Sequence, residues 1–146
     1  MATERLLALA PLRSAEYRWQ TMCSQSAAKL LLVVDDDPAI RETLADILHD
    51  EGYVVMTAAN GQDALSRLRA SGATPCVILL DLMMPVMSGP EFYDEMKNDP
   101  SLAAIPVIVI SADGNARRKV ATMGGQLIAK PVKIETVLSA VENHCS

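Results

Sequence analysis

The sequence predicts an α/β fold: a five-stranded, doubly wound parallel sheet with helices on both faces. Five short apolar runs alternate along the chain with five segments whose apolar residues recur at helical spacing. Strands that alternate with helices pair in parallel through right-handed crossovers, and runs that are apolar throughout indicate strands buried on both faces. The chain has 146 residues, of which 50% are hydrophobic and 21% charged, as expected for one globular domain.

The first strand–helix repeat starts at residue 30. Residues 30–34 are apolar throughout, so we expect a central strand there. A helix should follow from Pro38 to about residue 51, because Asp37 is a favoured N-cap residue and proline fits the first helical turn. Gly52 is expected to end this helix.

The second and third repeats follow the same pattern. A short strand is predicted at 53–56, and an Asn-Gly pair starts a helix at 60–69. The next strand, at 76–80, is an unbroken apolar run that is followed directly by Asp81. Because a carboxylate is seldom buried without a partner, this aspartate is the first candidate for a functional residue.

The remaining elements complete five repeats. Ser88 is a favoured helix N-cap, and Pro100 ends the helix that it starts. Two further apolar runs predict strands, and apolar residues at helical spacing predict the last helices. These elements are expected at 88–98 (helix), 105–110 (strand), 115–123 (helix), 126–129 (strand) and after Pro131 to about 144 (helix).

Residues 1–29 are predicted to be an N-terminal extension, flexible or partly helical, outside a domain that comprises residues 30–146. The extension holds four Arg and Lys residues and two Glu residues, whereas the whole chain has a net charge of −5. Its apolar stretch is preceded by Glu4 and interrupted by Pro11, which does not fit a secretory signal. A dispensable tail is the favoured interpretation, and a partner-binding segment is the alternative.

Composition excludes several classes of function. The negative net charge and the 3% of aromatic residues argue against nucleic-acid binding. No apolar run approaches the roughly 18 residues of a membrane span, so no membrane association is expected. The three cysteines, Cys23, Cys76 and Cys145, lie far apart without metal-binding or redox spacing, and we expect three unpaired thiols in a reducing cytoplasm.

Polar residues end four of the five predicted strands. Asp35 and Asp36 follow the first strand, Asp81 the third, Ser111 the fourth and Lys130 the fifth. The carboxyl ends of parallel strands meet at one edge of a sheet, so these side chains should lie close together. Three neighbouring carboxylates repel one another unless a cation lies between them. Their hard oxygen ligands suit Mg²⁺, which usually takes one or two carboxylates and keeps several waters.

This arrangement predicts phosphoryl-transfer chemistry. An ionised aspartate can attack phosphorus as a nucleophile and form an aspartyl phosphate. Such a reaction needs mainly positioning and neutralisation of charge. A magnesium ion, the Lys130 ammonium and the Ser111 hydroxyl would supply that neutralisation around a phosphoryl group on Asp81.

The set of motifs resembles the receiver domain of two-component response regulators, a flavodoxin-like (βα)5 fold. The resemblance covers residue 30 to the end of the chain. It rests on Val34-Asp35-Asp36, on Asp81 with Met83-Met84-Pro85 and Ser88-Gly89, on Ser111-Ala112, and on Lys130-Pro131.

The resemblance implies a role for each site residue. Asp81 is the phosphoacceptor and a metal ligand. Asp36 binds Mg²⁺ directly, Asp35 binds it through water, and the main-chain carbonyl of Met83 is a further ligand. Ser111 moves toward the phosphoryl group. Lys130 bridges Asp81 and the phosphate, and the bond between Lys130 and Pro131 is often cis. Met83 and Asp113 match positions that tune the lifetime of the phosphoryl group.

The resemblance also implies partners. Phosphohistidines of sensor histidine kinases or of histidine phosphotransfer proteins, and small acyl phosphates, are the expected donors. We expect a stand-alone cytoplasmic response regulator, a signalling domain and not an enzyme, that acts on a downstream protein by contact or by phosphorelay.

Two departures from the family pattern concern signal output. Leu127 stands three residues before Lys130, where receivers usually carry Tyr or Phe. Ser111 and Lys130 are about one helical turn closer in sequence than in typical receivers, which predicts a shortened fourth helix and a changed partner face. These departures favour a second interpretation, a pseudo-receiver that binds a partner without being phosphorylated, whereas the retained acids and lysine favour the first.

A third interpretation is an enzyme. Asp35-x-Asp37 after an apolar strand also resembles the haloacid-dehalogenase-like phosphatases, in which the first aspartate is the nucleophile. Those enzymes need a further acidic pair after the lysine. Only Glu135 and Glu142 follow Lys130, and both fall on the predicted last helix, so this interpretation is the weakest.

Overall fold

The computed structural model describes residues 29–123 and 125–145, and it confirms the predicted fold class. Five strands form one sheet in the order β2-β1-β3-β4-β5, and every neighbouring pair is parallel. The non-sequential order places β1 and β3 in the centre, with β2 and β5 at the edges. The strands are β1 (Leu30–Val34), β2 (Val54–Ala58), β3 (Val77–Asp81), β4 (Val107–Ser111) and β5 (Gln126–Ala129).

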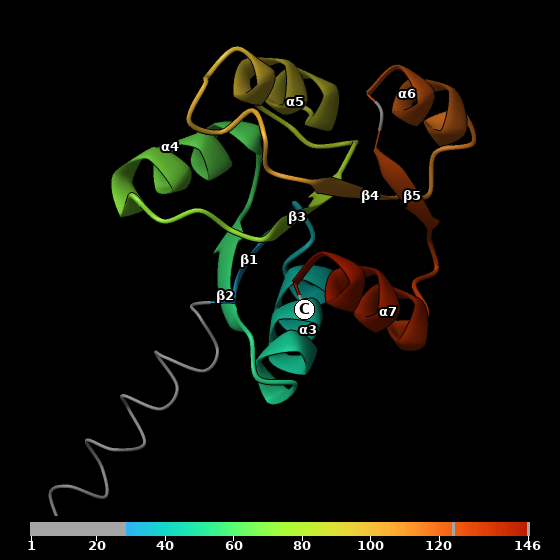
Figure 1. The fold of residues 1–146 in the computed structure, drawn as a ribbon. Coiled ribbons are helices and arrows are strands. Elements are labelled where there is room, and N and C mark those ends of the chain that lie inside the picture. The colour runs from blue at the N-terminus through green and yellow to red at the C-terminus, as the bar shows by residue number, and fades with distance from the viewer. Residues whose placement is uncertain (1–28, 124, 146) are drawn as a thin grey trace, which may run out of the picture.

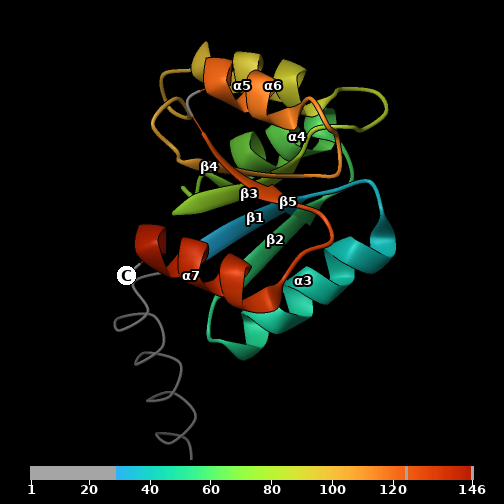
Figure 2. The ribbon, with the colours of Figure 1, turned by 90° about the vertical axis from the view of Figure 1, so that its right-hand side faces the viewer.

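Helices cover both faces of the sheet. Figures 1 and 2 show α4, α5 and α6 on one face and α3 and α7 on the other. The right-handed crossovers of a doubly wound sheet place α3 on one face and α4, α5 and α6 on the other, because the chain reverses its direction of winding after β2. The helices are α3 (Pro38–Asp50), α4 (Gly61–Ser71), α5 (Gly89–Lys97), α6 (Ala116–Met123) and α7 (Ile134–Cys145).

The sheet separates two hydrophobic cores. Alternate residues of the central strands point to opposite faces, so Ile78 and Leu80 pack with α4, α5 and α6, while Val77 and Leu79 pack with α3 and α7. All five residues of β3 and all five of β4 are buried. Burial on both faces explains why these strands have apolar runs without the alternation of a half-exposed strand.

The helix starts follow the sequence signals. The Asp37 side chain accepts a hydrogen bond from the Ala39 main chain at 2.9 Å, as predicted for an N-cap. Ser88 and Glu91 form a reciprocal capping box at the start of α5. These caps satisfy main-chain N–H groups that would otherwise lack partners at the helix ends.

Three predicted strands begin too early, and one of them, expected at 76–80, spans Val77–Asp81. The fourth strand was expected at 105–110 and spans Val107–Ser111, because Ile105 closes a turn with Leu102 before the ladder starts. The second was expected at 53–56 and spans Val54–Ala58, because the Tyr53 main chain still donates to Leu48 of α3. The shift of the fourth strand makes Ser111 its last residue.

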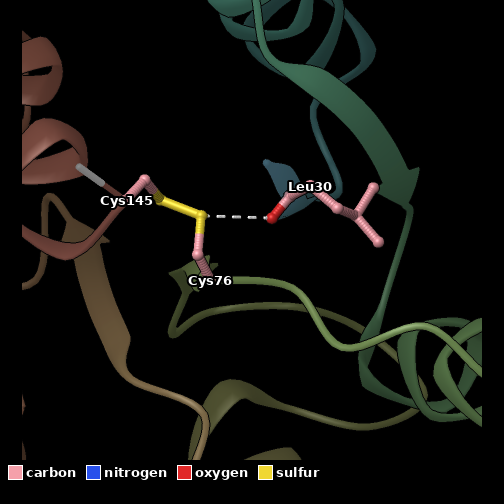
Figure 3. The surroundings of a disulfide bond; sticks show 3 residues. All are labelled: Leu30, Cys76 and Cys145. Atoms are coloured by element: carbon pink, nitrogen blue, oxygen red, sulfur yellow. Dashed lines mark hydrogen bonds between the residues drawn. A yellow bond between two sulfur atoms is a disulfide. The ribbon is translucent and has the colours of Figure 1, made fainter. Parts of the chain in front are cut away.

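The prediction of three unpaired thiols is wrong for two of the cysteines. Cys76, directly before β3, and Cys145, the last residue of α7, form a disulfide across 69 residues of sequence (Figure 3). Sequence spacing does not reveal the pairing, because the crossovers of the fold bring the start of β3 beside the end of α7. Cys23 and the rest of the predicted extension, up to residue 28, lie outside the described residues.

No helix in the described ranges, 29–123 and 125–145, is long and apolar enough to cross a membrane.

Gly89 allows the loop after β3 to pack against the strand end. A Cβ atom at this position would lie 2.6 Å from the Asp81 carbonyl oxygen and 2.7 Å from the Leu82 Cα atom. Neither of these main-chain atoms can move independently of the strand. We therefore expect Gly89→Ala to lower the free energy of unfolding by about 1–3 kcal/mol, as overpacked substitutions do.

Urea denaturation measures this effect. Gly114→Ala is the matched control, because a Cβ atom there meets nothing within 4 Å. We expect the control to stay within about 0.5 kcal/mol of the unmodified protein. Equal stabilities of the two variants would contradict the tight packing at Gly89.

Candidate functional site

The carboxyl edge of the sheet brings together all the predicted site residues. Asp35 directly follows β1, and Asp81 and Ser111 are the last residues of β3 and β4. These three side chains belong to the few buried polar residues of the described chain, with exposed fractions of 3%, 6% and 2%. Asp36 is exposed beside them, and Lys130 follows β5. Buried polar residues at one edge of an otherwise apolar sheet define the candidate site.

Lys130 connects the acidic residues. Its ammonium lies 3.2 Å from one carboxylate oxygen of Asp35 and 3.7 Å from a carboxylate oxygen of Asp81. The Lys130 main chain donates to the Ser111 carbonyl at 2.9 Å, which fixes the start of the side chain at the sheet edge. The peptide bond between Lys130 and Pro131 is cis. The lysine thus neutralises two buried carboxylates at once.

Asp35 has the most contacts among the site residues. One carboxylate oxygen accepts a hydrogen bond from the Asp37 main chain at 2.9 Å, and the other pairs with Lys130. The Asp35 carbonyl accepts a hydrogen bond from the Arg41 guanidinium at 2.8 Å. The sequence did not single out Arg41, although its position four residues after the helix N-cap placed it on the turn nearest the acids. The contacts with Asp37 and Lys130 hold the Asp35 carboxylate in one orientation, and Arg41 holds the main chain next to it.

Ser111 and Asp113 are organised by the turn after β4. The Ser111 hydroxyl oxygen accepts a hydrogen bond from the Asp113 main chain at 3.0 Å. The Asp113 carboxylate pairs with the Lys119 ammonium at 2.7 Å, and this pair is the main reason that the pKa of Asp113 is lowered. Arg117 and Arg118 are exposed, but Lys119 is half-buried and anchors the turn beside the site.

The surroundings of Asp81 disfavour the ionised form of its carboxyl group. Its pKa is raised to about 6, mainly by burial and next by the charge of Asp35, while the Lys130 ammonium acts in the opposite direction. The Met83 main chain lies within 3.5 Å of an Asp81 oxygen as a hydrogen-bond donor. A cation next to these acids would favour the ionised form of Asp81.

The three acids fit a divalent metal ion. One carboxylate oxygen from each of Asp35, Asp36 and Asp81 lies within 4.8 Å of the other two. Carboxylate oxygens are the ligands that Mg²⁺ takes in proteins, and the mutual repulsion that raises the Asp81 pKa is what a cation would relieve. The expected Met83 carbonyl ligand remains a prediction, because the contacts of this residue involve its N–H group.

The loop that follows β3 contains a strained residue. Val86 has a φ of 69°, in the left-handed region, and its side chain is 80% exposed. A β-branched residue is disfavoured there by roughly 1–2 kcal/mol. Because the exposed side chain contributes little packing, we expect Val86→Asn to raise the free energy of unfolding by about 1 kcal/mol.

Thermal and urea denaturation of the same samples measure this gain. Val54→Asn is the control, because Val54 is an exposed valine within a strand, where asparagine is disfavoured. The control should lose stability. A loss at both positions would mean that the Val86 side chain makes contacts that outweigh its backbone strain.

Leu127 lies beside the site. It lines a cavity of about 340 Å³ together with Ser111, Arg117 and Lys130. Leu127 is half-buried and packs against the core on the α4–α6 side of the sheet. The leucine that replaces the aromatic residue usual in the family is therefore adjacent to Ser111 and Lys130.

The fold and the site together define a class: single-sheet α/β proteins with a cluster of acids, a hydroxyl and a lysine at the carboxyl edge. The family model for the response regulator receiver domain matches residues 31–142. The chain belongs to the response regulator receiver domain family.

Relatives and solved structures agree with this assignment. The chain is 32% identical to Protein PilG of Pseudomonas aeruginosa over 126 residues, which cover 84% of this chain and 92% of PilG. It is 33% identical to hybrid signal transduction histidine kinase D of Dictyostelium discoideum, covering 78% of this chain and only 7% of that kinase. Chemotaxis protein CheY4 of Vibrio cholerae superposes with a TM-score of 0.71 at 30% identity, covering 79% of this chain and 97% of CheY4.

Proposed function

We propose that this receiver accepts a phosphoryl group on Asp81 from a phosphohistidine donor in a Mg²⁺-dependent reaction. In this step an Asp81 oxygen attacks phosphorus, the P–N bond breaks, and its electron pair returns to the imidazole of the donor. The observation that supports the proposal most strongly is the placement of Asp81 3.7 Å from the Lys130 ammonium and within one cluster with Asp35 and Asp36.

The chain's own residues supply most of the required charge balance. The Lys130 ammonium already bridges Asp35 and Asp81, so it is placed to interact with a phosphoryl oxygen on Asp81. The Ser111 hydroxyl proton is available for a phosphoryl oxygen, because Ser111 acts only as an acceptor toward Asp113. A magnesium ion held by Asp35, Asp36, Asp81 and the Met83 carbonyl would neutralise the remaining negative charge.

The surface beside Lys130 suits a protein donor. An apolar groove lies between α3 and the start of α7, lined by Ile40, Leu44, Pro131, Val132 and Ile134. It adjoins the phosphoacceptor site through Lys130. We propose that a sensor histidine kinase or histidine phosphotransfer protein docks in this groove. We also propose that the protein is cytoplasmic, because phosphohistidine donors are phosphorylated from ATP in the cytoplasm.

Signal output is proposed to use a changed partner face. The α6 helix has eight residues, and Leu127 lacks the hydroxyl and the bulk of the aromatic residue usual in the family. We therefore propose that a downstream protein, or a further phosphotransfer partner, recognises this chain by contacts other than an aromatic switch.

Intact-mass spectrometry after incubation with acetyl phosphate and Mg²⁺ tests the proposal. We expect one added phosphoryl group, and its loss when Mg²⁺ is removed or in Asp81→Asn. Asp94→Asn is the matched control, because Asp94 is an exposed aspartate on α5, and it should keep the adduct.

Two other results would overturn the proposal. No adduct under conditions that modify another receiver would favour the pseudo-receiver, which Leu127 and the short α6 helix support. An adduct that persists in Asp81→Asn would point to Asp35 as the nucleophile, as in the phosphatase interpretation.

A further inference from the structure

The Cys76–Cys145 disulfide joins two elements at the end of the sheet opposite the phosphoacceptor site. Cys76 precedes β3, whose last residue is Asp81, and Cys145 ends α7, which begins shortly after Lys130. The disulfide therefore fixes the far end of α7 near the start of β3, while the Lys130–Asp81 ion pair joins the segment before α7 to the end of β3. Figure 3 shows the two sulfur atoms between α7 and the start of the central strands.

The crosslink lies where it restrains α7. Cys145 is 5% exposed and belongs to the core formed by α3, α7 and the sheet. Its Cα atom lies 5.4 Å from that of Cys76, a separation that a disulfide spans without movement of the backbone. Without the crosslink, only packing would hold the last turn of α7, and helix ends open readily.

The reduced form is also compatible with the fold. The Cys76 sulfur lies 3.4 Å from the Leu30 carbonyl oxygen, so a Cys76 thiol has a hydrogen-bond acceptor in place (Figure 3). The Cys76 main-chain N–H donates to the same oxygen at 2.8 Å, which holds Cys76 in position in either redox state. A reduced Cys145 remains a small apolar side chain in the core. Neither state requires the domain to unfold.

We propose that Cys76 and Cys145 are a reversible redox modification site that holds the end of α7 on the sheet when oxidised and releases it when reduced. The oxidant is a low-molecular-weight disulfide of the glutathione type. The thiolate of Cys76, the more exposed residue, attacks it, forms a mixed disulfide and expels one thiol. The Cys145 thiolate then displaces the second thiol, so one S–S bond forms, one breaks, and the two cysteine protons end on the released thiols.

This site acts independently of the proposed phosphoryl transfer. In a reducing compartment a permanent disulfide is unusual, whereas a pair that both redox states accommodate can respond to oxidation. The response is a change in how firmly α7 is held, and the α3–α7 groove beside Lys130 includes the first residue of α7. Its test therefore needs no phosphorylation assay.

Thiol counting and hydrogen exchange test the proposal together. The full chain is equilibrated in buffers of increasing reduced-to-oxidised glutathione ratio, quenched in acid and alkylated with N-ethylmaleimide for intact-mass analysis. We expect the number of alkylated thiols to change from one to three, and from none to two in Cys23→Ser. Hydrogen exchange of peptides from α7 should become roughly tenfold faster or more in the reduced form, while α4 peptides keep their rates.

Cys145→Ser provides the control for the exchange experiment. It should give two alkylated thiols in reducing buffers. In oxidising buffers it should give a Cys76–glutathione adduct, which Cys145 is no longer present to resolve. Its α7 exchange should be fast in every buffer. Three alkylated thiols in the unmodified protein at every glutathione ratio would show that no disulfide forms. A single alkylated thiol at every ratio would show that the crosslink is permanent. Equal α7 exchange in both forms would show that the crosslink does not affect the helix. Each of these results would overturn the proposal.

Discussion

Reduction of the Cys76–Cys145 disulfide is expected to lower the free energy of unfolding by about 4 kcal/mol. The crosslink closes a loop with a sequence separation of 69 residues, which is nearly half of the chain. A loop of this size greatly restricts the unfolded chain, so breaking it raises the entropy of the unfolded state. In the folded state the change is confined to the end of α7, where Cys145 lies in the core.

Urea denaturation with and without a reducing agent measures this difference. Cys145→Ser should show the lower stability under both conditions, and Cys23→Ser should behave as the unmodified protein does. The slope of the transition should also be larger for the reduced protein, because its unfolded chain is more expanded. Identical midpoints with and without reductant would contradict a stabilising crosslink.

The metal-free protein is expected to lose roughly 2–3 kcal/mol of stability as the pH rises from about 4 to about 6. The reason is the Asp81 carboxyl group, whose pKa in the folded protein is raised to about 6 by burial and by the neighbouring Asp35 charge. Between its unfolded and folded pKa values, the folded state retains a proton that the unfolded state has released. Stability therefore falls with rising pH across this range and is constant above it.

Chemical denaturation at a series of pH values, in the presence of EDTA, measures this effect. Asp81→Asn should lose the decrease between pH 4 and 6 and should be more stable than the unmodified protein at pH 7.5. Glu91, Asp99 and Asp113 have lowered pKa values, so their contributions are lost as the pH falls below about 4, outside this window.

Magnesium provides the second half of this experiment. Because the ion binds ionised carboxylates, it should stabilise the unmodified protein more at pH 7.5 than at pH 5. Asp81→Asn should show a smaller gain at pH 7.5. An equal effect of Mg²⁺ at both pH values, or in both proteins, would contradict binding at the acid cluster.

The sequence predicted the fold because local and global signals agree in this chain. The apolar run at 77–80, the N-cap at Asp37 and the capping-box serine Ser88 each specify one element from residues close in sequence. The alternation of strands and helices then leaves few possible topologies. The position of Asp81 after a buried strand identified the site for the same reason, since every strand of a parallel sheet presents its carboxyl end at one edge.

The sequence did not predict how these residues neutralise one another. It indicated Asp35 as a metal ligand but not as the residue that pairs with Lys130 and receives a hydrogen bond from Asp37. It did not indicate that Lys119 pairs with Asp113. These contacts depend on side-chain directions at the ends of elements, which periodicity does not specify.

The sequence by itself determined the elements, their order and the residue types at the carboxyl edge of the sheet. Only the tertiary structure decided that Cys76 meets Cys145, that Gly89 packs on the Asp81 main chain, and that one ammonium serves two carboxylates. The physical reason is the sequence separation over which each kind of interaction acts. Helical periodicity, capping and strand burial are set by neighbours within a few residues, whereas a disulfide or an ion pair requires two distant segments to be packed within a few ångströms of each other.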